Sequence, residues 1–228
     1  TFWARVSGPP ESAAVDALTF CGSVPRFRDF LRARRTTRPA RPDVRGPAQN
    51  ERMTTYRFHT AATLDGFLAT DDDSLDWLFV HQQDNDVVEA MMPEIGAIVM
   101  GATTYRWLLA HLEQTGEAWY YAVPAFVFTH GTFEPIDPTV RFVSGTPTEH
   151  RSAIEAAAGD RDVWVMGGGG LAAEFADAGM LQRLEVSIAA DVIGSGRPLF
   201  TRAYRLALRE AVKNGDFVHT VYDVLGPA

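Results

Sequence analysis

The chain has 228 residues, 46% of them hydrophobic, and a formal net charge of -8. This length allows one large domain or two small ones, and the composition suffices for a sizeable core. Cys21 is the only cysteine, so an intrachain disulfide is excluded and a cytoplasmic location is favoured. No apolar stretch approaches the roughly 20 residues of a membrane-spanning helix, and we expect no membrane association.

Positive charge gathers in the first part of the chain. Residues 1–52 hold ten Arg, no Lys, five acidic residues and six Pro, without sustained periodicity, which is typical of a tail. No apolar segment follows Arg34 and Arg35, as a targeting signal would require. We therefore expect residues 1–52 to be a disordered or non-native leader, and residues 53–228, beginning at Met53, to form one domain. Because that domain is acidic, nucleic-acid binding is not expected.

From Met53 onward, apolar runs of strand length alternate with amphipathic stretches, which is the pattern of an α/β domain. The pattern predicts strands over 55–63, 95–100, 124–129, 139–143 and 162–166, and helices over 84–92, 102–111, 148–158 and 170–179. The runs 97–100 and 163–166 are continuously apolar, which predicts central strands covered on both faces.

The sequence pattern changes after Gly179. Strands are predicted over 181–190, 204–213 and 216–224 without helices between them, joined by turns at 194–196 and at Asn214-Gly215. Asn-Gly between two apolar runs is a strong hairpin signal. We therefore expect an antiparallel end to a mixed sheet.

A first candidate for chemistry is the junction Gly101-Ala102-Thr103-Thr104, where a buried strand gives way to a helix. Free backbone N–H groups and the positive end of a helix attract phosphate at such a junction. The two threonines add hydroxyl donors. A plain turn with threonine caps explains the same residues equally well.

A second junction contains four successive glycines, Gly167 to Gly170, followed by Leu171. Each glycine costs roughly 0.5–1 kcal/mol relative to alanine, so bare backbone is needed there. Close approach of a pyrophosphate is the simplest reason, and a merely permissive loop is the alternative. The segment also matches a dinucleotide fingerprint, but a Rossmann dehydrogenase needs an acid at the end of the next strand. The nearest candidate, Glu185, falls mid-strand.

The order of these motifs, MGATTY, VFTH and VMGGGGLAAEF before a long strand pair, resembles the dihydrofolate reductase-like superfamily. The segment Ala61–Ala69, AATLDGFLA, is similar to the S-L-D-G-x-I-A signature of the reductase domain in riboflavin-biosynthesis proteins. The resemblance covers residues 54 to about 224. It implies a three-layer α/β fold: a mixed eight-stranded sheet with central parallel strands, helices on both faces and an antiparallel C-terminal edge.

The resemblance also implies NADPH bound across the carboxyl ends of the parallel strands, and no metal. Carried over by position, the cofactor contacts would be Ala62, Gly101, Ala102, Thr103, Thr104, Thr129, Gly167, Gly168, Gly169, Gly170 and Leu171. Thr129 would lie beside the adenosine ribose. The Gly167–Gly168 peptide bond is expected to be cis.

Two departures from the family pattern concern charge. Ala102 stands where the family has an arginine, and Gly170 stands where true folate reductases have one. Thr129 and His130 supply hydrogen bonds rather than a fixed positive charge, so NADH remains open beside NADPH. A protonated His130 would add positive charge, but a lone histidine at a strand end is better explained as a solvated loop residue.

Hydride chemistry belongs to the nicotinamide, so few side chains are essential. Asp65 is the candidate catalytic carboxylate, because the LDG turn leaves the first strand at its functional end; an Asx-type turn is the alternative. Residues 71–77 form either an acidic lid or a solvated loop anchored by Leu75 and Trp77. Residues 81–89 hold no clear equivalent of the carboxylate with which folate reductases grip the pteridine.

These features predict an NADPH-dependent reductase of a small heterocycle, closest to 5-amino-6-(5-phosphoribosylamino)uracil reductase. A non-catalytic nucleotide-binding module, favoured by Ala102, and a reductase of an unrelated pterin- or quinone-like substrate are the alternatives. The zinc deaminase signature H-x-E…P-C-x-x-C is absent. A homodimer through the antiparallel end is expected, although Val186, Ile188 and Val192 there are explained equally well as core.

Overall fold

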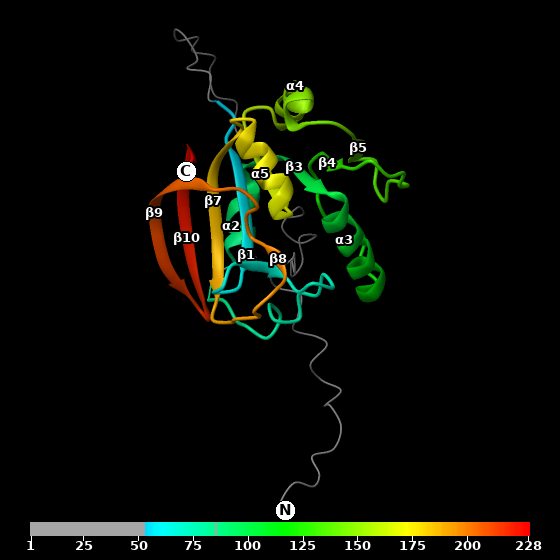
Figure 1. Cartoon of the computed structure of the whole chain (residues 1–228). Coiled ribbons are helices and arrows are strands. Elements are labelled where there is room, and N and C mark those ends of the chain that lie inside the picture. Colours follow the sequence, from blue (N-terminus) through cyan, green and yellow to red (C-terminus); the bar gives the residue numbers. More distant parts are fainter. Residues whose placement is uncertain (1–52, 85) are drawn as a thin grey trace, which may run out of the picture.

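The computed structural model describes residues 53–84 and 86–228; the predicted leader, residues 1–52, lies outside the described residues. The strands of the main sheet are β1 (Tyr56–Ala62), β3 (Ile95–Gly101), β4 (Ala125–Phe128), β5 (Val140–Val143), β6 (Asp162–Gly167), β7 (Leu181–Ala189), β9 (Tyr204–Asn214) and β10 (Phe217–Pro227). Their order is β5-β4-β3-β6-β1-β7-β10-β9 (Figure 1). The six strands from β5 to β7 are parallel, and β10 and β9 are antiparallel. A small sheet pairs β2 (Phe67–Ala69) with β8 (Arg197–Pro198).

Helices cover both faces of the main sheet. They are α2 (Val87–Met91), α3 (Ala102–Thr115), α4 (Pro147–Ala158) and α5 (Gly169–Asp177), with a 3-10 helix, η1, at Met92–Glu94. In β3, Val99 packs in one cluster with Phe175 of α5, whereas its neighbour Ile98 packs in the opposite cluster with Tyr105 of α3. All four side chains are fully buried. The expected three-layer fold, with β3 covered on two faces, is confirmed.

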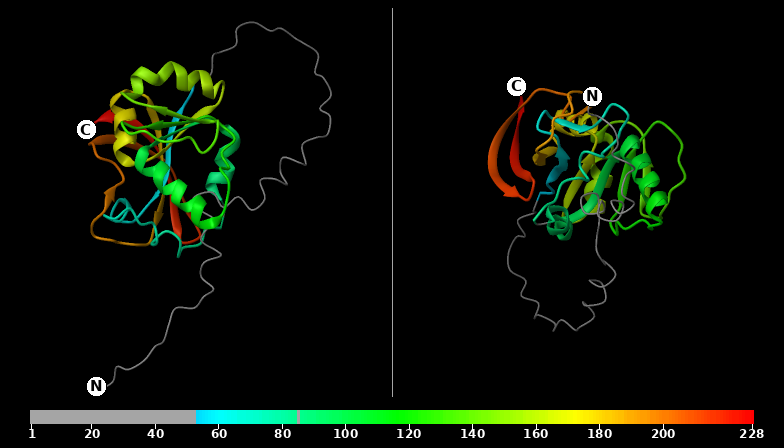
Figure 2. Two further views of the ribbon diagram at one scale, coloured as in Figure 1. Left: turned by 90° about the vertical axis from the view of Figure 1, so that its right-hand side faces the viewer. Right: turned by 90° about the horizontal axis from the view of Figure 1, so that it is seen from below.

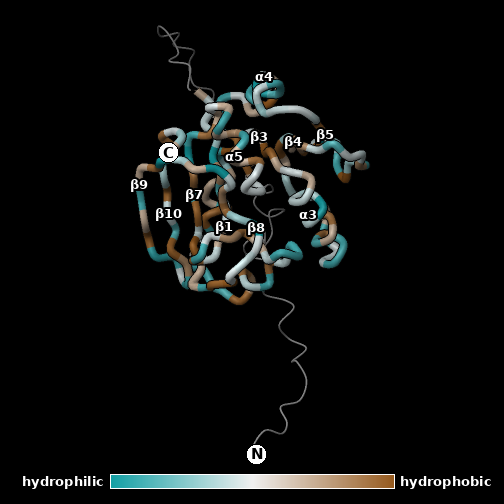
Figure 3. Tube along the Cα trace, in the orientation of Figure 1, coloured by the Kyte–Doolittle hydropathy of each residue, from teal (hydrophilic) through white to brown (hydrophobic). Residues whose placement is uncertain are grey.

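The hydrophobic pattern follows these layers. Figure 3 shows hydrophobic residues concentrated along β1 and β7, while α4 carries hydrophilic residues. This is the distribution expected when central strands are buried and a helix presents one face to water.

The observed elements depart from the expected ones mainly at their ends. The helix expected over 84–92 is shorter, because the Asp86 carboxylate caps it by accepting from the Glu89 amide at 2.9 Å, and a separate 3-10 turn that contains Pro93 begins at Met92. Helix α3 runs four residues further than expected, to Thr115, and ends at Gly116 with φ of +70°. The short strands β2 and β8 were not expected.

The C-terminal hairpin has the expected turn. Strand β9 ends at Asn214, Gly215 has a φ of +62°, and β10 begins at Phe217. Figure 2 shows this hairpin, in orange and red, at one end of the sheet, away from α3. Three residues near this end of the sheet were explained equally well by a dimer interface or by the core. Val186 is 1% exposed and Ile188 packs against the core, but Val192 is 67% exposed. The core explanation therefore holds for the first two.

Candidate cofactor site

The two glycine junctions meet at the carboxyl edge of the parallel strands. Met100 and Gly167 are register partners in β3 and β6. A Cβ placed on Gly101 would lie 3.8 Å from the carbonyl oxygen of Gly167, and one placed on Gly167 would lie 3.8 Å from the Thr104 hydroxyl. This edge is where open α/β sheets bind their ligands.

Both junctions open a helix that no side chain caps. The N-cap residues are Gly101 for α3 and Gly168 for α5, and neither helix has an acidic residue in its first turn. Helix α4 is different, because Thr146 and Glu149 close its first turn with a capping box. The first-turn amides of α3 and α5 thus keep their partial positive charge for an outside acceptor.

The four glycines fall into two kinds. Gly167 has a φ of +139°, and a Cβ on Gly169 would lie 2.4 Å from the Pro198 carbonyl oxygen, so the fold itself requires glycine at both. A Cβ on Gly168 or on Gly170 would meet nothing within 4 Å. The Gly167–Gly168 bond is cis, as expected. Backbone geometry therefore explains two glycines, and the other two border open space.

The remaining predicted contacts differ in what they can offer. Ala62 is 1% exposed and Leu171 is 9% exposed, with both side chains in the core, so only their backbone atoms could face a cofactor. Thr103 is exposed, and Ala102 and Thr104 are half-buried. Bare amides, threonine hydroxyls and open space beside Gly168 together fit a diphosphate.

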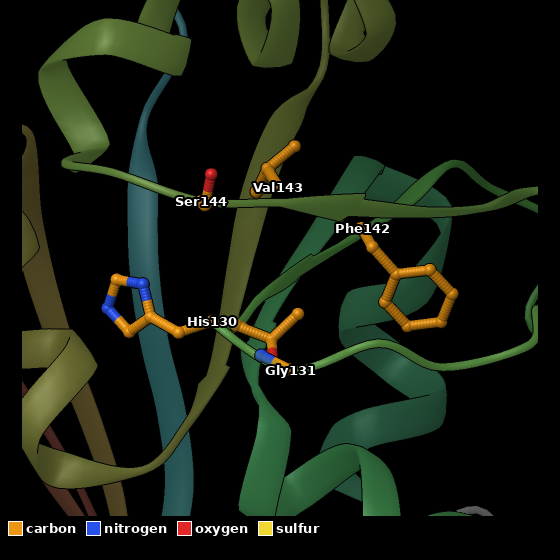
Figure 4. Close-up of a pocket in the computed structure, with 6 residues that line it drawn as sticks. His130, Gly131, Phe142, Val143 and Ser144 are labelled. Atoms are coloured by element: carbon orange, nitrogen blue, oxygen red, sulfur yellow. The ribbon is translucent and has the colours of Figure 1, made fainter.

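A shallow hollow lies where β4 and β5 end. Its volume is about 350 Å³, and its lining consists of Thr129, His130, Gly131, Phe142, Val143 and Ser144. Figure 4 shows the His130 ring and the Ser144 side chain at this hollow. The Thr129 hydroxyl accepts from the Gly131 amide at 2.9 Å. The lining contains no Lys or Arg, so it offers hydrogen bonds without a fixed charge.

Asp65 joins the LDG turn to the loop between β7 and β8. Its carboxylate accepts from the Thr63 hydroxyl at 2.5 Å and from the Gly194 and Ile193 amides at 2.7 Å and 3.4 Å. The Thr63 hydroxyl, followed by the amides, lowers the pKa of the Asp65 carboxyl. An exposed carboxylate of this kind stays ionised at neutral pH, which suits an acceptor and not a proton donor.

The acidic segment 71–77 is tied to the same loop. Asp71 accepts from the Ser195 hydroxyl at 2.7 Å, and Asp73 pairs with Arg197 at 2.6 Å. Trp77 is buried in a cluster with Phe217. The expected anchoring by Trp77 is present, although it is to the start of β10 and not to the next helix.

A buried charged network in the sheet was not expected. Arg57 of β1 donates to both carboxylate oxygens of Glu185 in β7, at 2.8 and 3.0 Å, and also to Glu94 at 2.6 Å. Nδ1 of His59 lies 3.2 Å from Oε2 of Glu185. Because Glu185 is 3% exposed and committed to these partners, it cannot serve as the ribose-binding acid of a Rossmann fold. Charged residues at alternate positions of an apolar strand were the overlooked signal.

Within the described residues, no group of three His, Cys, Asp or Glu side chains could hold a metal ion. No helix in that part of the chain is long and apolar enough to cross a membrane.

Known proteins resemble this chain in sequence and in fold. YwjB of Bacillus subtilis (strain 168), an uncharacterized protein, is 26% identical over 170 residues, which are 72% of this chain and 94% of YwjB. A Shewanella sp. PV-4 structure provisionally assigned to riboflavin biosynthesis has a TM-score of 0.64 and 23% identity, over 76% of this chain and 99% of that one.

A Thermotoga maritima diaminohydroxyphosphoribosylaminopyrimidine deaminase/5-amino-6-(5-phosphoribosylamino)uracil reductase has a TM-score of 0.51 and 15% identity. The match covers 75% of this chain and 57% of that one. At such identities the structures share the fold. The sequence model of the RibD C-terminal domain matches residues 55–216. The chain therefore belongs to the RibD C-terminal domain family.

Proposed function

We propose that this domain is an NADPH-dependent reductase of a small heterocycle, closest to 5-amino-6-(5-phosphoribosylamino)uracil reductase of riboflavin biosynthesis. The observation that carries the proposal is the meeting of two uncapped helix ends, at Gly101 and Gly168, on the carboxyl edge of the parallel strands. Family membership and the Thermotoga relative's stated reaction support it.

The chain's own part is binding and alignment. A nicotinamide cofactor supplies the hydride when bound. The amides at 101–104 and 168–171 would hold the diphosphate, and Thr129 would lie beside the adenosine ribose. Because the hollow at Thr129 lacks a fixed cation, NADH is kept as an alternative to NADPH.

Cofactor titration tests the proposal. We expect saturable binding of NADPH or NADH by calorimetry, followed by oxidation of the reduced cofactor with at least one member of a panel of aminouracils, pterins and quinones. Binding without any substrate-dependent oxidation would favour the non-catalytic module that Ala102 suggests. Oxidation with a pterin or a quinone alone would move the substrate away from riboflavin synthesis. Absence of binding would contradict the proposal.

Asp65 remains the proposed carboxylate near the reacting ring, acting as an ionised acceptor because its pKa is lowered. We expect Asp65→Asn to reduce kcat while leaving the cofactor dissociation constant unchanged, as measured by steady-state kinetics and calorimetry. Unchanged turnover would assign Asp65 to the turn alone, where it already holds Gly194.

A homodimer and a cytoplasmic location complete the proposal. Leu206 and Leu208 of β9 are 40% and 60% exposed, and Leu225 of β10 is 64% exposed. Exposed apolar side chains on an edge hairpin are suited to covering by a second copy. The molar mass in solution checks the dimer, and the single Cys21 supports the location.

A further inference from the structure

We propose that Arg106 binds the diphosphate of the dinucleotide cofactor, as the cation of a junction whose first helical residue, Ala102, carries no charge. This inference rests on the proposed function and adds a residue to its cofactor site. It concerns the diphosphate, which NADH and NADPH share, and not the phosphate that distinguishes them.

The geometry places the guanidinium over the start of α3. Helical side chains lean toward the N-terminus and cover the preceding turn. In agreement, Nη2 of Arg106 donates to the Thr103 hydroxyl at 3.3 Å. Thr103 lies in the first turn of α3, beside Thr104, whose hydroxyl approaches Gly167. The guanidinium therefore lies beside the first turn of α3, the helix that opens at the Gly101 junction.

The guanidinium is available to a ligand. Within the described residues, no carboxylate lies within 4.0 Å of the Arg106 guanidinium, which donates a hydrogen bond to the Thr103 hydroxyl. Arg57, Arg197 and Arg209 each pair with an acid instead. Arg106 is also exposed, so an incoming phosphate can reach it without displacing core residues.

The charge distribution at the N-terminus of α3 favours binding of an anion. A cation near a helix N-terminus is unfavourable, because it adds to the positive end of the dipole. Helix α3 has Arg106 near its N-terminus, no acidic residue in its first turn and no side-chain cap. Helix α5 likewise has neither an acidic residue in its first turn nor a side-chain cap. The chain therefore leaves positive potential at this junction uncompensated. A diphosphate would neutralise both helix ends and the guanidinium together.

The binding experiment compares Arg106→Gln with the unchanged full chain, using calorimetric titration with NADH and with NADPH. We expect both dissociation constants to rise about tenfold, since a hydrogen bond to a charged group is lost. Arg161→Gln is the matched control, because Arg161 is an exposed arginine at the start of β6, the opposite edge of the sheet. It should leave both constants unchanged.

Two further measurements separate a binding role from a structural one. Without cofactor, Arg106→Gln should keep or raise Tm, because an unfavourable charge is removed from α3. In the Arg106→Gln background, Ala102→Arg should restore part of the lost affinity by returning a cation to the junction.

The outcomes are distinct. No binding by the unchanged chain contradicts the proposed function as well as this inference. If the unchanged chain binds and Arg106→Gln binds equally well, only the role of Arg106 is wrong. A loss confined to NADPH would assign Arg106 to the adenosine phosphate and overturn the diphosphate contact.

Discussion

Glu185→Gln is expected to lower the free energy of unfolding by about 3–5 kcal/mol, the cost of breaking a buried ion pair by removing one partner. The substitution keeps the side chain's shape but leaves the buried Arg57 guanidinium without its bidentate acceptor. Denaturant unfolding followed by circular dichroism measures the change. Arg209→Gln, which removes an exposed pair with Asp223, should cost less than about 1 kcal/mol. Equal effects of the two variants would contradict the buried network.

The same network predicts how stability depends on pH. Burial alone would raise the pKa of the Glu185 carboxyl, but hydrogen bonds from His59 and from Arg57, with the Arg57 charge, lower it to about 2. A folded-state pKa below the ordinary value of 4.5 means that this stabilisation is complete above pH 4.5. It is lost as the pH falls from there toward 2. In Glu185→Gln this component of the acid dependence should disappear.

Gly169→Ala is expected to destabilise the domain by about 1–3 kcal/mol, the usual cost of overpacking. The added Cβ would lie 2.4 and 2.5 Å from the carbonyl oxygens of Pro198 and Leu199, which are backbone atoms and cannot rotate away. Gly170→Ala is the matched control, because a Cβ there meets nothing within 4 Å. Alanine in a helix should stabilise it by about 0.5–1 kcal/mol.

Thermal unfolding of the two variants checks this contrast. Equal melting temperatures for Gly169→Ala and Gly170→Ala would mean that the β8 backbone does not press on α5. Both variants should be titrated with NADPH as well, because Gly170 borders the proposed cofactor space and a methyl group there probes that space directly.

Much of the fold was predictable from local pattern. The continuous apolar run at 97–100 identified a strand buried on both faces, and Asn214-Gly215 identified the hairpin. Each of these signals lies within a few consecutive residues, so it can be recognised without knowing which distant segment the element packs against. The shortened helix α2 depends on a cap, Asp86, and on Pro93, and element ends of this kind are decided by single residues.

The site was only partly predictable, because its contacts join distant segments. Thr104 and Gly167 meet through the register of β3 and β6, which the glycine motifs implied. The pairing of Arg57 with Glu185 spans 128 residues, and periodicity carries no information about such a partner. The need for glycine at Gly169 likewise comes from β8, a strand of two residues that the sequence pattern did not reveal.

Leu199 gives the two halves of the site a common mechanical link. Its amide donates to the Gly66 carbonyl at 2.8 Å, while its own carbonyl oxygen abuts Gly169 at the start of α5. The LDG turn and the first turn of α5 are thus separated by a single residue. A shift of either segment would therefore act on the other through Leu199, so the LDG turn and the first turn of α5 are coupled by the backbone of one residue.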